Sequence, residues 1–259
     1  MSRIPEAFTK GRPALIAYVT AGYPDLPSSL ELAPKLEEWG CDIVELGIPF
    51  SDPLADGVTI QETSYKALQK GVTARDCIDL VRKIRKRTSI PLVFMTYYNI
   101  LLKYGLEDFC RASGEAGLDG IIVADMPPDE AGGLEKEAKK NGIDIIFLLS
   151  PNSDDRRISL VAKHSTGFIY LVSVTGVTGA REALPQELEA FVKKVRTFTS
   201  KPLCVGFGIS TEVQAAQVGR IADGVIVGSK LLQLVDSPPF SRLEAFVRSL
   251  RTALDKVKK

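Results

Sequence analysis

Residues 41–57 read CDIVELGIPFSDPLADG, an apolar run that carries one carboxylate and continues into a loop with two prolines. The run is typical of a strand that is buried on both faces. Glu45 interrupts it, although an ionised glutamate is rarely buried without a partner, because leaving water costs on the order of several kcal/mol. Asp56 follows on the loop. Two carboxylates at the end of a strand predict acid–base chemistry.

Similar apolar runs recur along the chain and alternate with longer amphipathic stretches. Continuously apolar runs are expected of a parallel sheet with both faces covered. The predicted strands are residues 14–20, 42–48, 91–97, 120–125, 144–150, 167–173, 202–208 and 223–228. Predicted helices include residues 28–40, 73–87, 106–117, 129–141, 154–164 and 184–198. Ser28 and Asp154 are predicted helix N-caps, and Gly40, Gly117 and Gly142 are predicted to end helices.

Eight strand–helix alternations in 259 residues predict an α/β fold, a single (β/α)₈ TIM barrel that occupies residues 1–259 as one domain. We expect a short helical extension at the N-terminus and a mobile loop over residues 175–185, after the sixth strand. A doubly wound open sheet is the alternative. It usually has fewer strands and often a Gly-x-Gly-x-x-Gly turn, which this sequence lacks.

The composition is that of an ordinary globular protein, with 45% hydrophobic and 25% charged residues and a net charge of +1. A basic cluster at 82–87 is interpreted as the end of a helix, where cations offset the helix dipole; an anionic partner is the alternative. The four cysteines form no Cys-x-x-Cys pair, which argues against a zinc site or disulfide scaffold. Without a membrane span or signal peptide, the expected location is the cytoplasm, or the plastid stroma for a processed organellar form.

The active site of such a barrel forms at the carboxyl ends of its strands. Glu45, Asp56, Asp125 and Tyr170 are the chemically capable side chains expected there. If Glu45 faces the barrel interior, burial raises its pKa so that it donates a proton near neutral pH, while Asp56 stays ionised. The alternative is a buried Glu45 paired with a Lys or Arg of a neighbouring strand.

Glycines gather after the last three predicted strands, at residues 176–179, 206–208 and 228. Glycine lets backbone N–H groups approach an anion, and the loops after strands seven and eight are the recurrent phosphate site of this fold. The sequence therefore predicts phosphate binding, with residues 229–232 as a short extra helix above the site. Each glycine pair alone is weak support, because turns use glycine for conformational reasons.

Other candidates are less useful for chemistry. His164 is the only histidine, and we expect it at the surface of a helix away from the site, which excludes a Ser-His-Asp triad and a multi-histidine metal centre. Trp39 is interpreted as packing. Phe207 either walls an aromatic substrate or fills the barrel.

The residues quoted above resemble the tryptophan synthase alpha subunit family. The motif ELGIPFSDPLADG with Gln61 closely resembles the signature of that family. Further motifs agree in order over essentially the whole chain, namely YVTAGYP, MTYYN, VADMP, YLVS, GVTG and GFGIS. The first motif is long and highly specific.

The resemblance implies a lyase that cleaves indole-3-glycerol phosphate to indole and glyceraldehyde 3-phosphate without a metal or organic cofactor. By resemblance, Glu45 is the acid–base residue and Asp56 stabilises the positive charge on the indole. Positions around the indole and glycerol are matched by Tyr18, Ile60, Tyr97, Tyr170 and Phe207. The loop threonine that reaches the aspartate on lid closure is matched by Thr178, and the phosphate contacts by Gly179, Gly208, Gly228 and Ser229.

The resemblance also implies a partner, a pyridoxal-phosphate-dependent beta subunit in an alpha2-beta2 complex, with Pro49 and Asn99 near the interface. The sequence departs from the family where many members carry an arginine after the loop serine, since Val174-Thr175 stands there. This leaves lid control open. Three other readings also remain: another phosphate-binding barrel enzyme such as an isomerase, a ligand-binding subunit that mainly activates its partner, and a stand-alone indole lyase.

Overall fold

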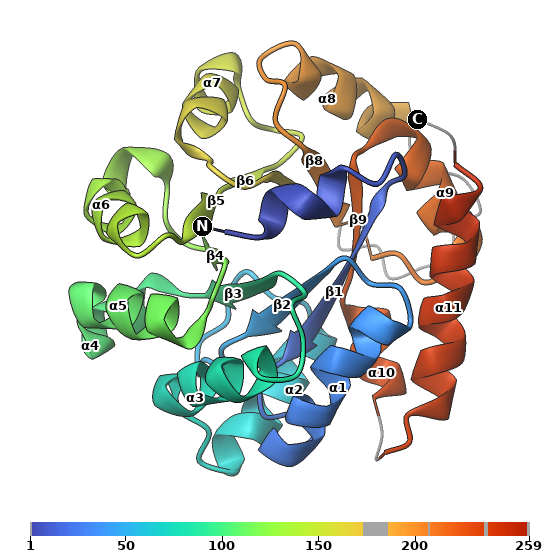
Figure 1. Ribbon diagram of the computed structural model, residues 1–259. Coiled ribbons are helices and arrows are strands. Elements are labelled where there is room, and N and C mark those ends of the chain that lie inside the picture. The colour runs from blue at the N-terminus through green and yellow to red at the C-terminus, as the bar shows by residue number, and fades with distance from the viewer. Residues whose placement is uncertain (1, 173–185, 207, 236–237, 258–259) are drawn as a thin grey trace.

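The computed structural model describes residues 2–172, 186–206, 208–235 and 238–257. Its strands are β1 (Ala14–Thr20), β2 (Ile43–Gly47), β3 (Leu92–Thr96), β4 (Gly120–Val123), β5 (Asp144–Ile146), β6 (Leu148–Leu149), β7 (Ile169–Val172), β8 (Leu203–Gly206) and β9 (Gly224–Val227). All pairs are parallel, in the order β5-β4-β3-β2-β1-β9-β8-β7-β6. Because only Phe147 separates β5 from β6, these two share one position and the sheet closes into a barrel (Figure 1). The predicted barrel is confirmed.

Helices surround the ring of strands, except η1, which lies across one end of it (Figure 1). The helices are η1 (Ile4–Phe8), α1 (Leu26–Glu38), α2 (Val58–Gln69), α3 (Ala74–Arg85), α4 (Tyr98–Tyr104), α5 (Leu106–Ala116), η2 (Pro128–Glu130), α6 (Gly132–Lys140), α7 (Asp155–His164), α8 (Gln186–Arg196), α9 (Glu212–Ile221), α10 (Ser229–Leu234) and α11 (Ser241–Asp255). The expected N-terminal helical extension is η1. The loop expected to be mobile, over residues 175–185, lies outside the described residues.

Three local predictions differ from the structure. The helix predicted over residues 129–141 is divided into η2 and α6. Ser28 does not cap the first helix: α1 begins at Leu26, and the Asp25 carboxylate accepts the Ser28 N–H at 2.8 Å. Asp25 takes this place because a proline in the first helical turn needs no N–H partner. The strand predicted over residues 144–150 is broken at Phe147. The Asp154 cap is confirmed, since its carboxylate accepts the Arg157 N–H at 2.7 Å.

Apolar side chains form two layers, one inside the barrel and one between the sheet and the helices. Ile43 belongs to the inner layer, whereas Val44 and Leu46 belong to the outer one, as the two-residue period of a strand requires. The inner layer is closed at one end by η1, whose Ile4 and Ala7 are buried. In Figure 1 this N-terminal segment lies across the middle of the ring.

Three aspartates tie neighbouring strands together at their amino ends. Each directly precedes a strand, accepts a backbone N–H of the preceding barrel strand at 2.9 Å and pairs with an arginine of a surrounding helix. The sets of aspartate, backbone donor and arginine are Asp42 with Leu15 and Arg251, Asp119 with Leu92 and Arg85, and Asp223 with Leu203 and Arg196. These bonds satisfy backbone N–H groups and carboxylates whose burial without a partner would be costly at the amino ends of the strands.

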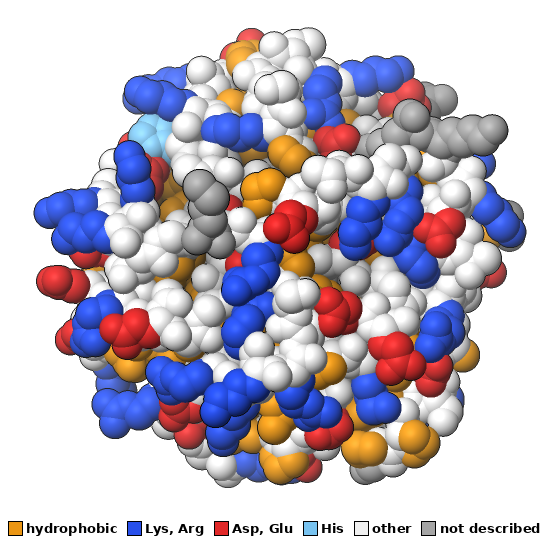
Figure 2. Space-filling model, in the orientation of Figure 1, with side chains coloured by type: hydrophobic (Ala, Val, Ile, Leu, Met, Phe, Trp, Pro, Cys, Tyr) orange, Lys and Arg blue, Asp and Glu red, His pale blue; other side chains and the backbone are white. Residues whose placement is uncertain are grey.

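The basic cluster at 82–87 falls at the end of α3, as predicted. Its Arg85 also reaches the Gly117 carbonyl and the Asp119 carboxylate, so this cation is part of the framework. Arg87 pairs with Glu31. On the face seen in Figure 2, Lys and Arg side chains are interspersed with Asp and Glu. The helix-end interpretation therefore agrees with the structure.

Candidate active site

Glu45 lies on β2, near its carboxyl end, on the strand face that points into the barrel. Its side chain is 0% exposed, and among the described residues neither carboxyl oxygen has a hydrogen-bond partner. The predicted burial is confirmed, and the alternative of an ion pair with a neighbouring strand is wrong, because no Lys or Arg of the described strands pairs with Glu45. Because burial disfavours the charged form, the pKa of Glu45 is raised to about 8. An acid held in this way is protonated at neutral pH.

Two phenols lie near Glu45, the buried Tyr18 and the half-buried Tyr170. Tyr18 pairs with Glu45 in the register of β1 and β2, and burial raises the pKa of Tyr18 and of Tyr170, with nearby carboxylates adding to the effect. Their hydroxyls occupy space that a side chain would need: a Cβ on Gly47 would lie 2.1 Å from the Tyr18 oxygen, and one on Gly206 would lie 2.5 Å from the Tyr170 oxygen. The glycines at these positions are therefore required for close approach of the phenols.

Asp56 belongs to the loop between β2 and α2. The Tyr97 hydroxyl donates to its Oδ2 at 3.0 Å and accepts the Ala55 N–H at 3.1 Å. The ring of Tyr97 stacks on Phe50 with a centroid distance of 4.8 Å, and the Gln61 amide donates to the Asp56 carbonyl at 2.8 Å. The loop that carries the second carboxylate is thus held through both its backbone and its side chain.

The two carboxyl groups have different acidities. Burial raises the pKa of Asp56 to about 6, and the hydrogen bond from Tyr97 opposes that rise. The pKa of Glu45 is about 8. Between these values Asp56 is largely ionised while Glu45 is largely protonated, so the site offers one hydrogen-bond-accepting anion and one proton donor.

The remaining predicted site residues fall into two groups. Thr178, Gly179 and Phe207, together with Val174, lie outside the described residues. Of the others, Gly208 has φ +66° with nothing within 4 Å of a built Cβ, and Gly228 immediately precedes α10, where Ser229 is the first residue. Ile60 lies in the first turn of α2, and its carbonyl accepts the Thr63 hydroxyl at 3.0 Å.

Of the residues that were set aside, Trp39 agrees with its interpretation as packing, whereas His164 is less exposed than predicted. Trp39 is 2% exposed and belongs to the outer apolar layer. His164 lies on α7, with its Nδ1 2.7 Å from Oε1 of Glu135 on α6. It is partly buried because α6 covers it. All four cysteines are free and buried. Among the described residues, no cluster of His, Cys, Asp or Glu could hold a metal ion, and no helix has the length and apolarity to cross a membrane.

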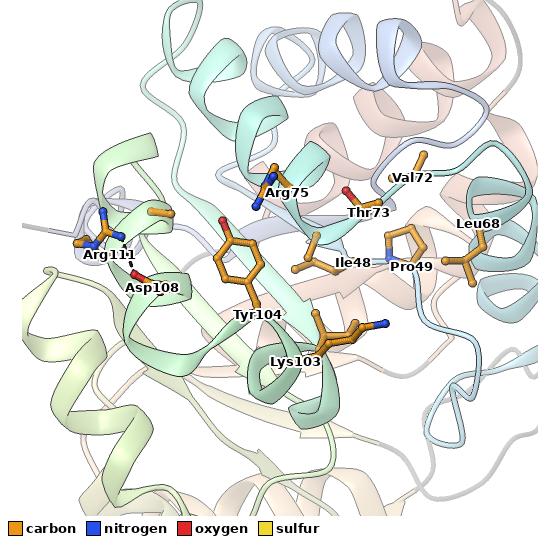
Figure 3. A pocket seen from close by; sticks show the side chains of 13 residues that line it. Ile48, Pro49, Leu68, Val72, Thr73, Arg75, Lys103, Tyr104, Asp108 and Arg111 are labelled. Carbon is orange, nitrogen blue, oxygen red and sulfur yellow. Dashed lines mark hydrogen bonds and ion pairs between the residues drawn. The ribbon is translucent and has the colours of Figure 1, made fainter.

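A cavity of about 790 Å³ opens beside the loop of Asp56 (Figure 3). Ile48 and Pro49 form one side, and residues of α2 to α5 form the others, with Arg75, Lys103 and Tyr104 among them. Neither Glu45 nor Asp56 lines it. Sequence patterns did not indicate this cavity, because its walls come together from separate elements.

The chain matches the family model described as "Tryptophan synthase alpha chain" over residues 5–258. The chain belongs to the tryptophan synthase alpha chain family. It is 54% identical to the alpha chain of Dehalococcoides mccartyi, with 98% of this chain and 100% of that one covered, and 48% identical to that of Roseiflexus sp., with 97% and 100% covered.

Solved structures of the family have the same fold. The alpha subunit of Legionella pneumophila superposes with a TM-score of 0.92 at 35% identity, covering 99% of this chain and 100% of that one. A chain of Mycobacterium tuberculosis tryptophan synthase gives a TM-score of 0.91 at 38% identity, with 98% of each chain covered. The resemblance noted in the sequence is thereby confirmed.

Proposed function

We propose that this chain cleaves indole-3-glycerol phosphate to indole and glyceraldehyde 3-phosphate. The observation that carries the proposal is the buried Glu45, whose carboxyl oxygens have no partner among the described residues. A buried polar group without a partner is costly, so such a group in a strand facing the barrel interior is expected where a substrate supplies the partner. Family membership supports the choice of substrate.

The protons and electrons of the reaction balance with these two carboxyl groups. Protonated Glu45 gives its proton to C3 of the indole, and positive charge develops on the ring nitrogen. The Glu45 carboxylate then takes the proton of the hydroxyl on the adjoining glycerol carbon, the carbon–carbon bond breaks, and its electrons return to the indole ring. Asp56, as an anion, accepts the indole N–H and stabilises the positive charge.

The substrate contacts are proposed from the family resemblance. We assign the indole and glycerol surroundings to Tyr18, Ile60, Tyr97, Tyr170, Thr178 and Phe207, and the phosphate to Gly179, Gly208, Gly228 and Ser229. Two observations support the second group. Gly208 has open space around it, and Gly228 and Ser229 begin the short helix α10, as expected for the phosphate end of a (β/α)₈ site.

The proposed partner is a tryptophan synthase beta subunit in an alpha2-beta2 complex. The similar M. tuberculosis chain comes from a tryptophan synthase structure. On this chain, Leu54 and Val58 beside Asp56 are 94% and 71% exposed, and Leu102 of α4 is 57% exposed. Large apolar side chains exposed near the site fit a protein interface. We assign pyridoxal phosphate to the beta subunit and no residue of this chain to that cofactor.

The test is indole release from indole-3-glycerol phosphate by the purified chain, alone and with a beta subunit. Slow cleavage that rises with the partner is expected. Full activity of the chain alone would instead indicate a stand-alone lyase. Absence of cleavage in both conditions, together with activation of the beta reaction, would show a subunit that only activates its partner.

A further inference from the structure

Asp125 is the second residue after β4, at the same end of the barrel as Glu45, and the reaction proposed above gives it no role. Its Oδ1 accepts the backbone N–H of Tyr98 at 2.8 Å. Tyr98 is the first residue of α4, and the residue at the N-cap position provides no side-chain cap. The cap of α4 is therefore provided by the segment that follows β4. A carboxylate here also offsets the positive end of the helix dipole.

Tyr97 occupies that N-cap position, one residue before the capped amide. It is 5% exposed, its ring stacks on Phe50, and its hydroxyl bonds Asp56 and the Ala55 N–H. A helix of seven residues has little stability of its own, so its first turn depends on the cap. A shift of that turn would move the Tyr97 hydroxyl away from the Asp56 carboxylate.

We propose that Asp125 is a positioning residue, which acts on Asp56 through the first turn of α4 and the Tyr97 hydroxyl. This inference rests on the proposed function, because Asp56 is the group whose placement serves the reaction. Asp56 must meet the indole nitrogen where charge develops, and misplacement of such a group by about 1 Å can lower the rate by up to about 100-fold. The loss should therefore appear in kcat rather than in KM.

The acidity of Asp56 gives a second readout. Among the described residues, the phenols of Tyr18, Tyr97 and Tyr170 interact electrostatically with the Asp56 carboxylate. The pKa of each phenol is raised above its ordinary value, so all three stay neutral between about pH 6 and pH 8. Within the part of the chain that the structure describes, only the Tyr97 bond favours the ionised form of Asp56. Loss of that bond should therefore raise the pKa of Asp56 and move the acid limb of the pH–rate profile upward.

The experiment compares Asp125→Ala, Tyr97→Phe and the double variant in the complex with the beta subunit and in the chain alone. We expect each single variant to lower kcat about tenfold and to move the acid limb upward by about one pH unit. The kcat of the double variant should be no lower than that of the less active single variant, because both substitutions break the same link. Asp125→Asn keeps an acceptor oxygen and should restore most of the activity lost in Asp125→Ala.

Asp154→Ala is the matched control, since Asp154 caps α7 through the same kind of bond without contact to Tyr97 or Asp56. If Asp125→Ala and Asp154→Ala have equal effects, or if the double variant loses about 100-fold (the product of the singles), the inference is overturned. An unshifted acid limb would also overturn it. NMR titration of the Asp56 carboxyl group in Asp125→Ala measures its pKa, and so tests the link, without any need for activity. Failure of the wild-type chain to cleave the substrate would therefore refute the proposed function and leave the test of Asp125 intact.

Discussion

Replacement of Glu45 by glutamine should abolish cleavage and at the same time stabilise the protein. Glutamine has the shape of the protonated glutamic acid, so it preserves the packing of the barrel interior. The native state, however, holds the carboxyl with a pKa of about 8 against an ordinary value of 4.5. A carboxyl with a raised folded pKa destabilises the folded state at every pH where the unfolded chain would ionise it.

The magnitude follows from the two pKa values. Below pH 4.5 the group is protonated in both states, and the variant should match the wild type. From there the penalty grows by about 1.4 kcal/mol per pH unit, so the variant should be more stable by about 3 kcal/mol at pH 7. The difference should level off at about 4 to 5 kcal/mol above pH 8, where the folded protein also ionises.

Urea unfolding at several pH values, followed by fluorescence of the single buried Trp39, measures this difference. The control is Glu62→Gln, which removes an exposed carboxylate of α2 and should change stability by no more than about 0.5 kcal/mol. A stability difference for Glu45→Gln that stays flat from pH 5 to pH 8, or a variant less stable than the wild type at pH 7, would refute the reasoning.

Three further outcomes are expected. The rate of indole release should peak near pH 7, falling below pH 6 as Asp56 is protonated and above pH 8 as Glu45 loses its proton; a flat profile over this range would contradict the assignment. Gly47→Ala should lower stability by about 1 to 3 kcal/mol in thermal unfolding, because its Cβ would meet a phenol oxygen at 2.1 Å, whereas Gly132→Ala, with nothing within 4 Å, should not. Asp119→Ala should cost about 3 kcal/mol in urea unfolding, because it removes a buried carboxylate from the partly buried Arg85 and Arg3 and leaves the buried Leu92 N–H without its acceptor; a cost below about 1 kcal/mol would show that this network contributes little.

Local patterns determine the elements of this protein well. Apolar runs mark the strands, because a strand covered on both faces must be apolar throughout. Period two places Ile43 and Glu45 on one face, and the closed barrel turns that face inward. Boundaries are less certain, as the break at Phe147 and the Asp25 cap show, because they depend on hydrogen bonds chosen among several neighbouring residues.

The signature motif identified the two carboxyl groups and the family. It carried no information on what surrounds them, since the groups that bond or approach them come from other parts of the chain. The bond between Tyr97 and Asp56 joins residues 41 positions apart, and that between Asp125 and Tyr98 joins residues 27 apart. Neither follows from a periodicity or a local motif.

The sequence alone therefore determined the barrel, the burial of Glu45 and the family. Only the tertiary structure decided that no cation pairs with Glu45 among the described residues, that Gly47 makes room for a phenol, and that Asp56 is held by Tyr97. The physical reason is that periodicity sets which face a side chain is on, whereas its partners are set by which strands and loops the closed barrel brings together.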